Sequence, residues 1–270
     1  MKLLKIYIGG LMQNSLKVYL ISLKEDIQRR EKLKIRFKET YDSFNHIEAV
    51  DGRLLSSKEY FEKTQPFFSK YQRIISPAEF GCTLSHIKVL KEFLRTDSNF
   101  ALILEDDVIG DDEDILRIKN IIDGLDTNSI ILCGGQDGLN SRYQFFKETK
   151  QKNVYEVSSF SYAFIYRTCC YIVSKTSAKN ILDYHENLFI TIADKWDVFF
   201  KNTNTKIYYS KIFKHPEDLS NSHIELDRKR NNKTFIRKLF SKDILKKIIL
   251  KFYYEFMCCI LLLIGYKRLD

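Results

Sequence analysis

The sequence predicts an α/β fold with a mainly parallel sheet, because strand patterns alternate with helix patterns through the first 135 residues. Residues 18–23 and 101–104 are short apolar runs, which is typical of strands that are buried on both faces. Between them, Ser76-Pro77 marks a helix start, because proline is favoured in the first turn and Glu79 follows it there. In sheets of this kind, ligands bind at the carboxyl ends of the strands.

The other elements follow from apolar periodicity and turn residues. A charged helix is predicted over 24–40, because Leu33 and Phe37 fall near one face. Turn dipeptides such as Asp51-Gly52 and Gly134-Gly135 mark the ends of two further strands. The remaining predictions are strands at 46–50 and 130–133, a helix at 77–94, strand-like segments at 164–166 and 171–173, and a helix at 177–184.

Length and charge divide the chain into a globular body and a basic appendage. With 270 residues, 44% of them hydrophobic, the chain can bury a full core as one large domain or two small ones. The formal net charge is +9, but ten Lys/Arg and two Asp between residues 227 and 251 contribute +8 of it. The rest is nearly neutral, unlike a protein whose whole surface binds nucleic acid. We therefore predict a globular domain over 1–226 and a basic amphipathic tail over 227–270.

Cysteine spacing and the N-terminus predict a reduced, cytoplasmic protein. The six cysteines form two adjacent pairs and two isolated residues, which match neither a disulfide framework nor a zinc motif. No signal peptide is predicted, because Gly9-Gly10 and the polar residues 13–17 interrupt the first apolar stretch. Met12 is an alternative start, since the patterned sequence begins only at Val18.

Three consecutive acids, Glu105, Asp106 and Asp107, follow the buried strand at 101–104. Clustered carboxylates at a strand end are a natural place for a divalent cation, because hard cations prefer oxygen ligands and bring phosphate oxygens with them. A solvated acidic turn is the alternative. Residues 22–24 and Asp51-Gly52 lie at the same predicted sheet edge, so one cleft would collect all three segments.

Several segments together resemble glycosyltransferase family 25, the lipopolysaccharide and lipooligosaccharide glycosyltransferases. The resemblance extends from about residue 17 to about residue 225. The combination of PAEFGCTLSH and ALILEDDV is specific enough to make a chance match improbable. The matching segments are VYLISLK at 18–24 with Arg29-Arg30-Glu31, AVDGR at 49–53, SPAEFGCTLSHI at 76–87, ALILEDDV at 101–108, and Ala193-Asp194 with Trp196.

The resemblance implies a GT-A-like fold, a UDP-sugar donor, usually UDP-galactose, and an acceptor sugar on a growing glycan. By analogy with other GT-A enzymes, the acidic run would hold Mn²⁺ or Mg²⁺ against the diphosphate, where the metal stabilises the charge of the leaving group. Asp107 is the first choice as direct ligand. Strand alternation would put Glu105 on the same side and turn Asp106 elsewhere, as a donor contact.

Four further residues are candidate donor contacts. Ser22 stands where the family usually has Asn, which leaves its contact open. Asp51 would hydrogen-bond the ribose or uracil, or form an ordinary Asp-Gly turn. Arg30 would meet the diphosphate or uracil, or lie exposed beside Arg29. His86 falls inside the matched motif, although a buried structural histidine is the default interpretation.

Inversion at the anomeric carbon needs a carboxylate that takes the proton of the acceptor hydroxyl. Asp194 and Asp197 would share a face of a helix, with Asp194 the first choice as base, and Trp196 offers a surface on which a sugar could stack. A helix start with Asp194 complementing the dipole is the alternative. His215 and His223 would either supply a metal ligand near the end of the domain, as in some GT-A enzymes, or lie in a surface loop. The sequence favours the loop.

The tail predicts peripheral attachment to the inner face of a bacterial inner membrane. From residue 241, apolar residues such as Ile248, Phe252 and Phe256 recur at helical spacing, with lysines between them. The apolar run at 256–264 is too short to span a bilayer, which needs roughly 20 helical residues. Packing of this helix on the protein body is the alternative. Lipid-linked acceptors, implied by the resemblance, would then lie on the same surface as the enzyme.

Three other functions stay open from the sequence. A transferase acting on a protein or on another glycan would use the same cleft. A nucleic-acid-binding protein would use residues 227–251, although the nearly neutral body and the apolar face of the tail favour a membrane. A non-catalytic, sugar-binding relative is disfavoured by the intact acidic run.

Overall fold

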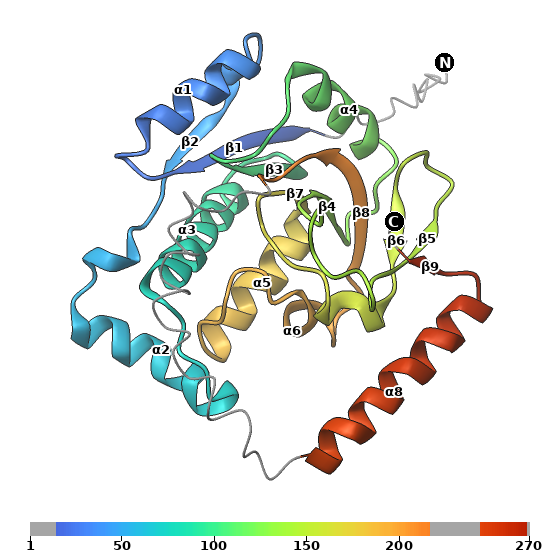
Figure 1. Ribbon diagram of the computed structural model, residues 1–270. Helices are drawn as coiled ribbons and strands as arrows, with labels where there is room; N and C mark the ends of the chain where they lie inside the picture. Colours follow the sequence, from blue (N-terminus) through green and yellow to red (C-terminus); the bar gives the residue numbers. More distant parts are fainter. Residues whose placement is uncertain (1–14, 217–243, 269–270) are drawn as a thin grey trace, which may run out of the picture.

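A computed structural model describes residues 15–216 and 244–268 of the chain (Figure 1). Within these residues one mixed sheet forms the centre of the molecule, with the strand order β2-β1-β3-β7-β4-β8-β6-β5-β9. The strands are β1 Leu16–Ser22, β2 Asn45–Glu48, β3 Phe100–Glu105, β4 Ser129–Gly134, β5 Phe145–Glu148, β6 Tyr155–Val157, β7 Cys170–Ser174, β8 Lys206–Phe213 and β9 Lys267–Arg268.

Strand direction gives the sheet its Rossmann-type character. β1 is parallel to β2 and β3, and β4 is parallel to β8. β7 lies between β3 and β4 and runs antiparallel to both, so β1, β2, β3, β4 and β8 all point the same way. β6, β5 and β9 extend one edge as antiparallel strands. The predicted α/β class, with a mainly parallel sheet flanked by helices, is confirmed.

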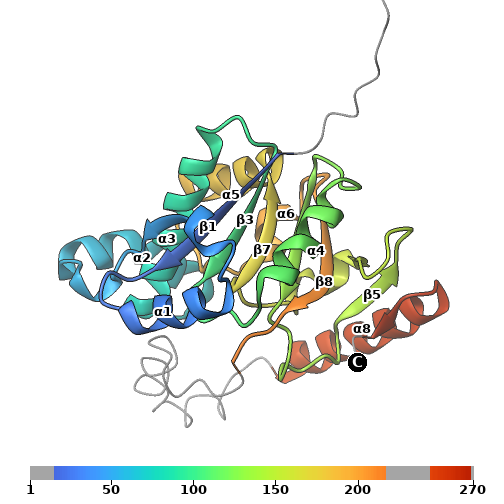
Figure 2. The ribbon, with the colours of Figure 1, turned by 90° about the horizontal axis from the view of Figure 1, so that it is seen from above.

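Helices cover both faces of the sheet (Figures 1 and 2). α1 and α4 lie on one face, while α3, α5 and α6 lie on the other, with α2 packed beyond the start of α3. The helix predicted from Ser76-Pro77 is present, with a capping box between Ser76 and Glu79. The bounds are α1 Ile27–Arg36, α2 Ser57–Tyr71, α3 Pro77–Leu94, α4 Asp112–Ile122, α5 Lys175–Asn187, α6 Trp196–Phe200 and α8 Ile244–Leu263.

Side chains of β3 alternate between the two hydrophobic cores that these layers enclose. Ala101 and Ile103 pack in the core beneath α3 and α5, whereas Leu102 and Leu104 pack in the core beneath α1 and α4. Because both faces of β3 are covered, the strand is an uninterrupted apolar run. This confirms the sequence interpretation and fixes where the run ends, at Glu105.

Two predicted elements differ from the structure. The first helix ends at Arg36 rather than at residue 40. The strand predicted at 164–166 is absent from the described chain, and this segment is an irregular loop that leads into β7. Gln144 donates a hydrogen bond to the carbonyl of Phe164, and Gln136 donates one to the carbonyl of Tyr166. Because side chains satisfy these backbone groups, no neighbouring strand is needed.

The C-terminal helix α8 packs on the body of the protein and also presents an exposed apolar side. Cys258 and Leu261 are buried against Phe145 of β5, and β9 pairs with that same strand. Among the described residues, no helix combines the length and the apolar composition needed to cross a bilayer. Residues 1–14, His223 and the predicted tail segment 227–243 lie outside the described residues.

A close backbone contact fixes the turn after β2 against α3. A Cβ added to Gly52 would lie 1.9 Å from the carbonyl oxygen of Pro77, and one added to Gly81 would lie 2.4 Å from that of Val50. Only glycine leaves room for this approach. Asp51 is therefore held against the start of α3 by the glycine that follows it.

We expect Gly52→Ala to lower the free energy of unfolding by about 1–3 kcal/mol, because the added methyl group overpacks a rigid backbone contact. Urea denaturation measures the change. Gly124→Ala is the matched control, because its Cβ would meet only the flexible side chain of Gln151 at 3.2 Å. Equal stability of the two variants would contradict the role of this contact.

Candidate functional site

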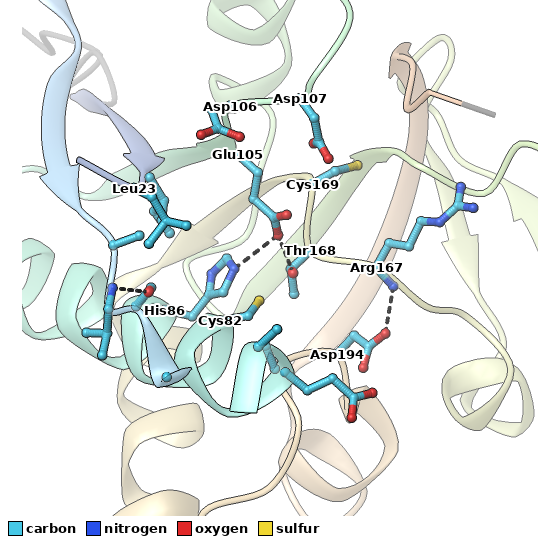
Figure 3. Close-up of a pocket in the computed structure, with 18 of the residues that line it drawn as sticks. Leu23, Cys82, His86, Glu105, Asp106, Asp107, Arg167, Thr168, Cys169 and Asp194 are labelled. Atoms are coloured by element: carbon cyan, nitrogen blue, oxygen red, sulfur yellow. Dashed lines mark hydrogen bonds and ion pairs between the residues drawn. The ribbon is translucent and has the colours of Figure 1, made fainter. Parts of the chain in front are cut away.

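A cavity of about 610 Å³ opens at the carboxyl ends of β1 and β3 (Figure 3). This volume lies in the range of small-molecule sites, roughly 300–1,000 Å³. Arg30 and Asp197 do not line it. The predicted site residues that do line it are Ser22, Asp51, His86, Glu105, Asp106, Asp107 and Asp194.

The strand order explains why these residues meet. β1 lies between β2 and β3 and is parallel to both. The chain therefore passes from β1 to β2 on one side and then crosses to β3 on the other side of β1. Such a switch point leaves a crevice at the carboxyl ends of the strands. Ser22 ends β1, Asp51 follows β2, and Glu105 ends β3. The predicted common cleft is therefore present.

Arg29 faces the cavity, and Arg30 holds the loop beside it. The Arg30 guanidinium donates hydrogen bonds to Ser22 Oγ at 2.9 Å, to the carbonyl of Leu23 and to the carbonyl of Lys24 at 2.8 Å. Arg29 lines the cavity and pairs with Asp106 at 2.9 Å. The sequence selected the wrong member of this arginine pair as the cavity residue, because adjacent helical residues point about 100° apart and nothing in the sequence fixes the helix rotation.

Asp51 is held by its neighbour Arg53. It accepts the backbone N–H of Arg53 at 2.9 Å, and its two carboxylate oxygens receive the guanidinium at 2.7 Å each. This is a bidentate, charge-assisted pair on the wall of the cavity. Both interpretations of the Asp-Gly dipeptide are therefore realised, since Asp51 forms the turn and also lines the cavity.

Glu105 is an ionised carboxylate held by two side chains. Thr168 Oγ1 donates to Glu105 Oε1 at 2.5 Å, and His86 Nε2 lies 3.2 Å from the same oxygen. Burial raises the pKa of Glu105, but the hydrogen bonds from His86 and Thr168 outweigh burial and lower it overall. The other ring nitrogen of His86, Nδ1, lies 2.9 Å from the Tyr171 hydroxyl. His86 is thus buried, as the default interpretation expected, and also contacts the acidic run.

Asp106 is the least exposed acid of the run and pairs with Arg29. Burial raises the pKa of Asp106 to about 6, although hydrogen bonds from Ser22 and Arg29 oppose the shift. Its carboxylate points away from Asp107, toward the loop after β1 (Figure 3). Asp106 and Asp107 lie in the turn after β3, so the predicted strand alternation does not extend to them, and all three acids line the cavity.

Asp107 and His215 form a corner suited to a divalent cation. His215 Nε2 lies 3.5 Å from Asp107 Oδ2, and Asp107 Oδ1 is buried without a hydrogen-bond partner in the part of the chain that the structure describes. Burial lowers the pKa of His215, but the hydrogen bond and the charge of Asp107 outweigh it and raise the pKa. A carboxylate and an imidazole suit Mn²⁺, and a buried oxygen that lacks a partner is unfavourable unless something binds it.

The position of His215 follows from a short backbone bridge. Ile109 and Lys214 exchange two hydrogen bonds, of 2.8 and 2.9 Å, between their N–H and carbonyl groups. The loop that carries Asp107 is therefore attached to the residue before His215. The sequence favoured a surface loop here, and that prediction is wrong, because His215 lines the cavity.

A second, softer donor set lies in the same cavity. One ligand atom each from Cys82, His86 and Glu105 lies within 4.8 Å of the others. Thiol, imidazole and carboxylate together suit zinc better than magnesium. Glu105 therefore faces Cys82 and His86 (Figure 3), whereas Asp107 lies beside His215.

Asp194 lines the cavity, whereas Asp197 and Trp196 do not. Asp194 Oδ2 accepts the backbone N–H of Arg167 at 2.9 Å. α6 starts at Trp196, so the predicted shared helix face of Asp194 and Asp197 is absent, and Asp197 lies 3.4 Å from Lys195 Nζ. Trp196 is 1% exposed and packs among Tyr171, Phe199 and Phe200, so it offers no surface to a sugar.

Fold and cavity together define an α/β protein with an acidic, nucleotide-sized cleft at the switch point of its sheet. The sequence profile of glycosyltransferase family 25 (LPS biosynthesis protein) matches residues 15–196. The chain belongs to this family. The matched range contains all the strands and helices that position the acidic run, and it stops before β8 and His215.

Relatives in animals match shorter segments. A glycosyltransferase 25 family member of Drosophila melanogaster is 34% identical over 97 residues, which cover 34% of this chain and 16% of that protein. One of Aedes aegypti is 27% identical over 172 residues, covering 62% and 28%. Procollagen galactosyltransferase 1-B of Xenopus laevis is 31% identical over 96 residues, covering 34% and 16%. The chain thus spans well under a third of the length of these relatives.

Two solved structures align over most of the chain at low identity. Mannose-1-phosphate geranyltransferase from Thermus thermophilus has 10% identity and a TM-score of 0.38, covering 76% of this chain and 75% of that one. S. aureus TarS 1–349 has 12% identity and a TM-score of 0.34, covering 73% and 60%. The α/β fold class follows from the order and direction of the strands.

The raised pKa of Asp106 predicts a pH-dependent stability. An acid whose pKa is higher in the folded state destabilises the fold as pH rises from its ordinary value of 3.8 through about 6. The stability lost over that pH interval is roughly 3 kcal/mol. The prediction concerns the free energy of unfolding of Asp106→Asn minus that of the unsubstituted protein, measured in the presence of EDTA. Between pH 4 and pH 8 this difference should rise by up to about 3 kcal/mol.

Urea denaturation at both pH values measures this difference. Asp123→Asn, at the exposed C-cap of α4, is the matched control and should show no such trend. A constant difference between Asp106→Asn and the unsubstituted protein would show that Asp106 titrates normally.

Proposed function

We propose that this protein transfers a hexose, galactose in the first instance, from a UDP-sugar to an oligosaccharide acceptor of lipooligosaccharide or lipopolysaccharide, with inversion at the anomeric carbon. The observation that carries the proposal is the Asp107–His215 corner at the sheet's switch point, where a buried carboxylate oxygen has no partner within the described chain. Membership of glycosyltransferase family 25 supports the reaction class.

Asp107 and His215 would hold Mn²⁺ or Mg²⁺, and the predicted ligand Glu105 lies next to them in the same cavity. When bound, such a cation neutralises the negative charge that builds on the diphosphate as UDP leaves. Arg29 and the loop after β1 form the neighbouring wall. There Ser22, Asp51 and Asp106 remain the proposed contacts for the nucleoside end of the donor.

Asp194 is the proposed general base. The acceptor hydroxyl oxygen forms a bond to the anomeric carbon while its proton passes to the Asp194 carboxylate. The bond between that carbon and the β-phosphate oxygen breaks, and UDP leaves with the electron pair. The hydrogen bond from the Arg167 N–H fixes the orientation of the carboxylate. Asp197 is set aside as an alternative base, because it is outside the cavity lining and lies beside Lys195.

A protein-bound acceptor is the second candidate. The Xenopus laevis relative is named as a procollagen galactosyltransferase, which supports galactose as the transferred sugar and a hydroxyl on a polypeptide as the acceptor. The family description names LPS biosynthesis, which favours the glycan acceptor. Transfer assays with an oligosaccharide and with a collagen-like peptide distinguish the two candidates.

The exposed side of α8 supports peripheral attachment to the inner face of a membrane. Ile249, Phe252, Phe256 and Leu263 are exposed, with Phe252 72% exposed, and their spacing places them along one side of the helix. Lys251 is also exposed and points about 100° around the helix from Phe252. Cys258 and Leu261 occupy the opposite, buried side. An apolar face next to basic residues fits an anionic bilayer surface, so 227–270 would act as the attachment segment of a cytoplasmic enzyme.

Asp107→Asn and Asp194→Asn should separate donor binding from transfer. Asp107→Asn should weaken manganese-dependent UDP binding at least about 100-fold, because the charged ligand is lost. Asp194→Asn should bind UDP normally and lose transfer at least about 100-fold, because its amide still accepts the Arg167 N–H but takes no proton. Calorimetry with UDP and manganese, and UDP release with and without acceptor, measure the two effects.

Asp123→Asn serves as the control for removal of an exposed carboxylate, since it does not line the cavity. Normal UDP binding by Asp107→Asn would disprove the metal assignment. Normal turnover by Asp194→Asn would remove it as the base, and absence of any UDP-sugar turnover by the unsubstituted protein would disprove the function.

Phe252→Ser combined with Phe256→Ser should reduce binding to vesicles that contain phosphatidylglycerol at least about tenfold, because full burial of one phenylalanine contributes roughly 1.5–3 kcal/mol. Co-sedimentation measures the bound fraction. Leu116→Ser removes another exposed apolar side chain, this one from α4, and should have no effect. Unchanged sedimentation of the double variant would contradict attachment through α8.

A further inference from the structure

The loop that enters β7 lies across the acidic run from Asp51. At the sheet edge the order is β2, β1, β3, β7, β4, so the segment before β7 is separated from Asp51 by both β1 and β3. Tyr166, Arg167 and Thr168 line the cavity from this loop. Figure 3 shows Asp106 and Leu23 on one side of Glu105, and Arg167 on the other. The loop therefore faces the part of the cavity beyond the proposed donor site.

Arg167 is held in an unusual and well-supported conformation. Its φ is +71°, a left-handed value that costs a non-glycine residue of order 1 kcal/mol or more. Its backbone N–H donates to Asp194, and its Nη1 donates to the carbonyls of Gly135 at 2.8 Å and Asp137 at 3.0 Å. Gly135, whose carbonyl accepts one of these bonds, packs closely on Cys169: an added Cβ would lie 2.6 Å from Cys169 Sγ.

The charge of Arg167 has no acidic counterpart in the described chain. The other arginines of the cavity wall pair with carboxylates: Arg29 with Asp106, Arg53 with Asp51, and Arg73 with Glu79. Arg167 contacts two neutral carbonyls through Nη1 and has no ion pair with a described residue. A guanidinium has five N–H donors, so Nη2 and Nε keep the fork that binds carboxylate or phosphate.

Tyr166 supplies an aromatic surface next to this charge. It is 43% exposed, lines the cavity and makes no ring contact with another aromatic residue of the described chain. Burial raises the pKa of Tyr166, and the charges of Asp194 and Asp197 add to the increase. An amphipathic ring of this kind packs against the apolar face of a sugar while its hydroxyl stays hydrated.

We propose that Tyr166 and Arg167 form an acceptor subsite for an acidic sugar, one that carries a carboxylate or a phosphate group. The ring of Tyr166 stacks on the sugar, and the Arg167 fork binds its anionic group. The assignment of this subsite to the acceptor rests on the proposed glycosyl transfer. Because the Arg167 N–H holds Asp194, anchoring the anion also places a neighbouring hydroxyl beside the base.

Direct binding tests the subsite without catalysis. Saturation-transfer NMR would compare methyl β-glucoside, methyl β-glucuronide and glucose 6-phosphate, with UDP affinity measured separately. At least one acidic sugar should bind about tenfold or more tighter than the neutral one, because hydrogen bonds to charged groups contribute roughly 1.5–3 kcal/mol. The two acidic probes distinguish a carboxylate from a phosphate site.

Arg167→Gln should abolish the preference for the acidic sugar and leave UDP affinity unchanged. Tyr166→Ala should weaken all three sugars by a similar factor, and Arg167→Lys should keep part of the preference, since it keeps the charge but loses the fork. Arg95→Gln, an exposed arginine at the end of α3, is the charge-matched control. Thermal unfolding confirms that each variant is folded.

Equal affinity for charged and neutral sugars would overturn the proposal. So would a loss of UDP affinity in Arg167→Gln, which would assign this residue to the donor diphosphate instead. The proposed function is tested separately by UDP-sugar turnover in the unsubstituted protein. Turnover without a preference for acidic sugars disproves only the subsite, whereas a preference without any turnover disproves only the transferase activity.

Discussion

The antiparallel pairing of β7 with β3 is the interaction on which the cavity depends. Leu104 pairs with Cys170, and the N–H of Glu105 donates to the carbonyl of Cys169 at 2.9 Å. Because β7 runs against β3, its beginning lies beside the end of β3. That register brings Thr168 to the carboxylate of Glu105 and Arg167 to the far side of the acidic run. A parallel β7 would put this loop at the opposite edge of the sheet.

A second constraint is the number of carboxylates in one cavity. Like charges at short range destabilise one another, and burial adds to the cost. Most of these acids have a defined partner: Asp51 has Arg53, Asp106 has Arg29, Glu105 has Thr168 and His86, and Asp194 has a backbone N–H. Asp107 differs, because one of its oxygens has no partner in the described chain. A bound cation would therefore stabilise the cavity most at Asp107.

Local patterns predicted the elements that lie close together in sequence. The buried strand before Glu105, the capped helix from Pro77 and the turn at Asp51-Gly52 all follow from short-range periodicity and turn chemistry. Errors arose where a long-range contact decides. The sequence predicts that Trp196 offers a surface on which a sugar could stack, yet α6 turns this side chain into the core against Tyr171. His215 was assigned to a surface loop because its partner, Asp107, is more than a hundred residues away.

The fold class, the family resemblance and the collection of Ser22, Asp51 and Glu105–Asp107 at one sheet edge could all be inferred from the amino-acid pattern, because parallel strands end on the same side. Which side chains face the cavity depends on how the whole chain packs. Helix rotation chose Arg29 over Arg30, the Ile109–Lys214 bridge brought His215 to Asp107, and the β7 register placed Arg167 opposite the donor side. These choices depend on contacts between residues far apart in the chain, whose geometry is fixed by packing rather than by local propensity.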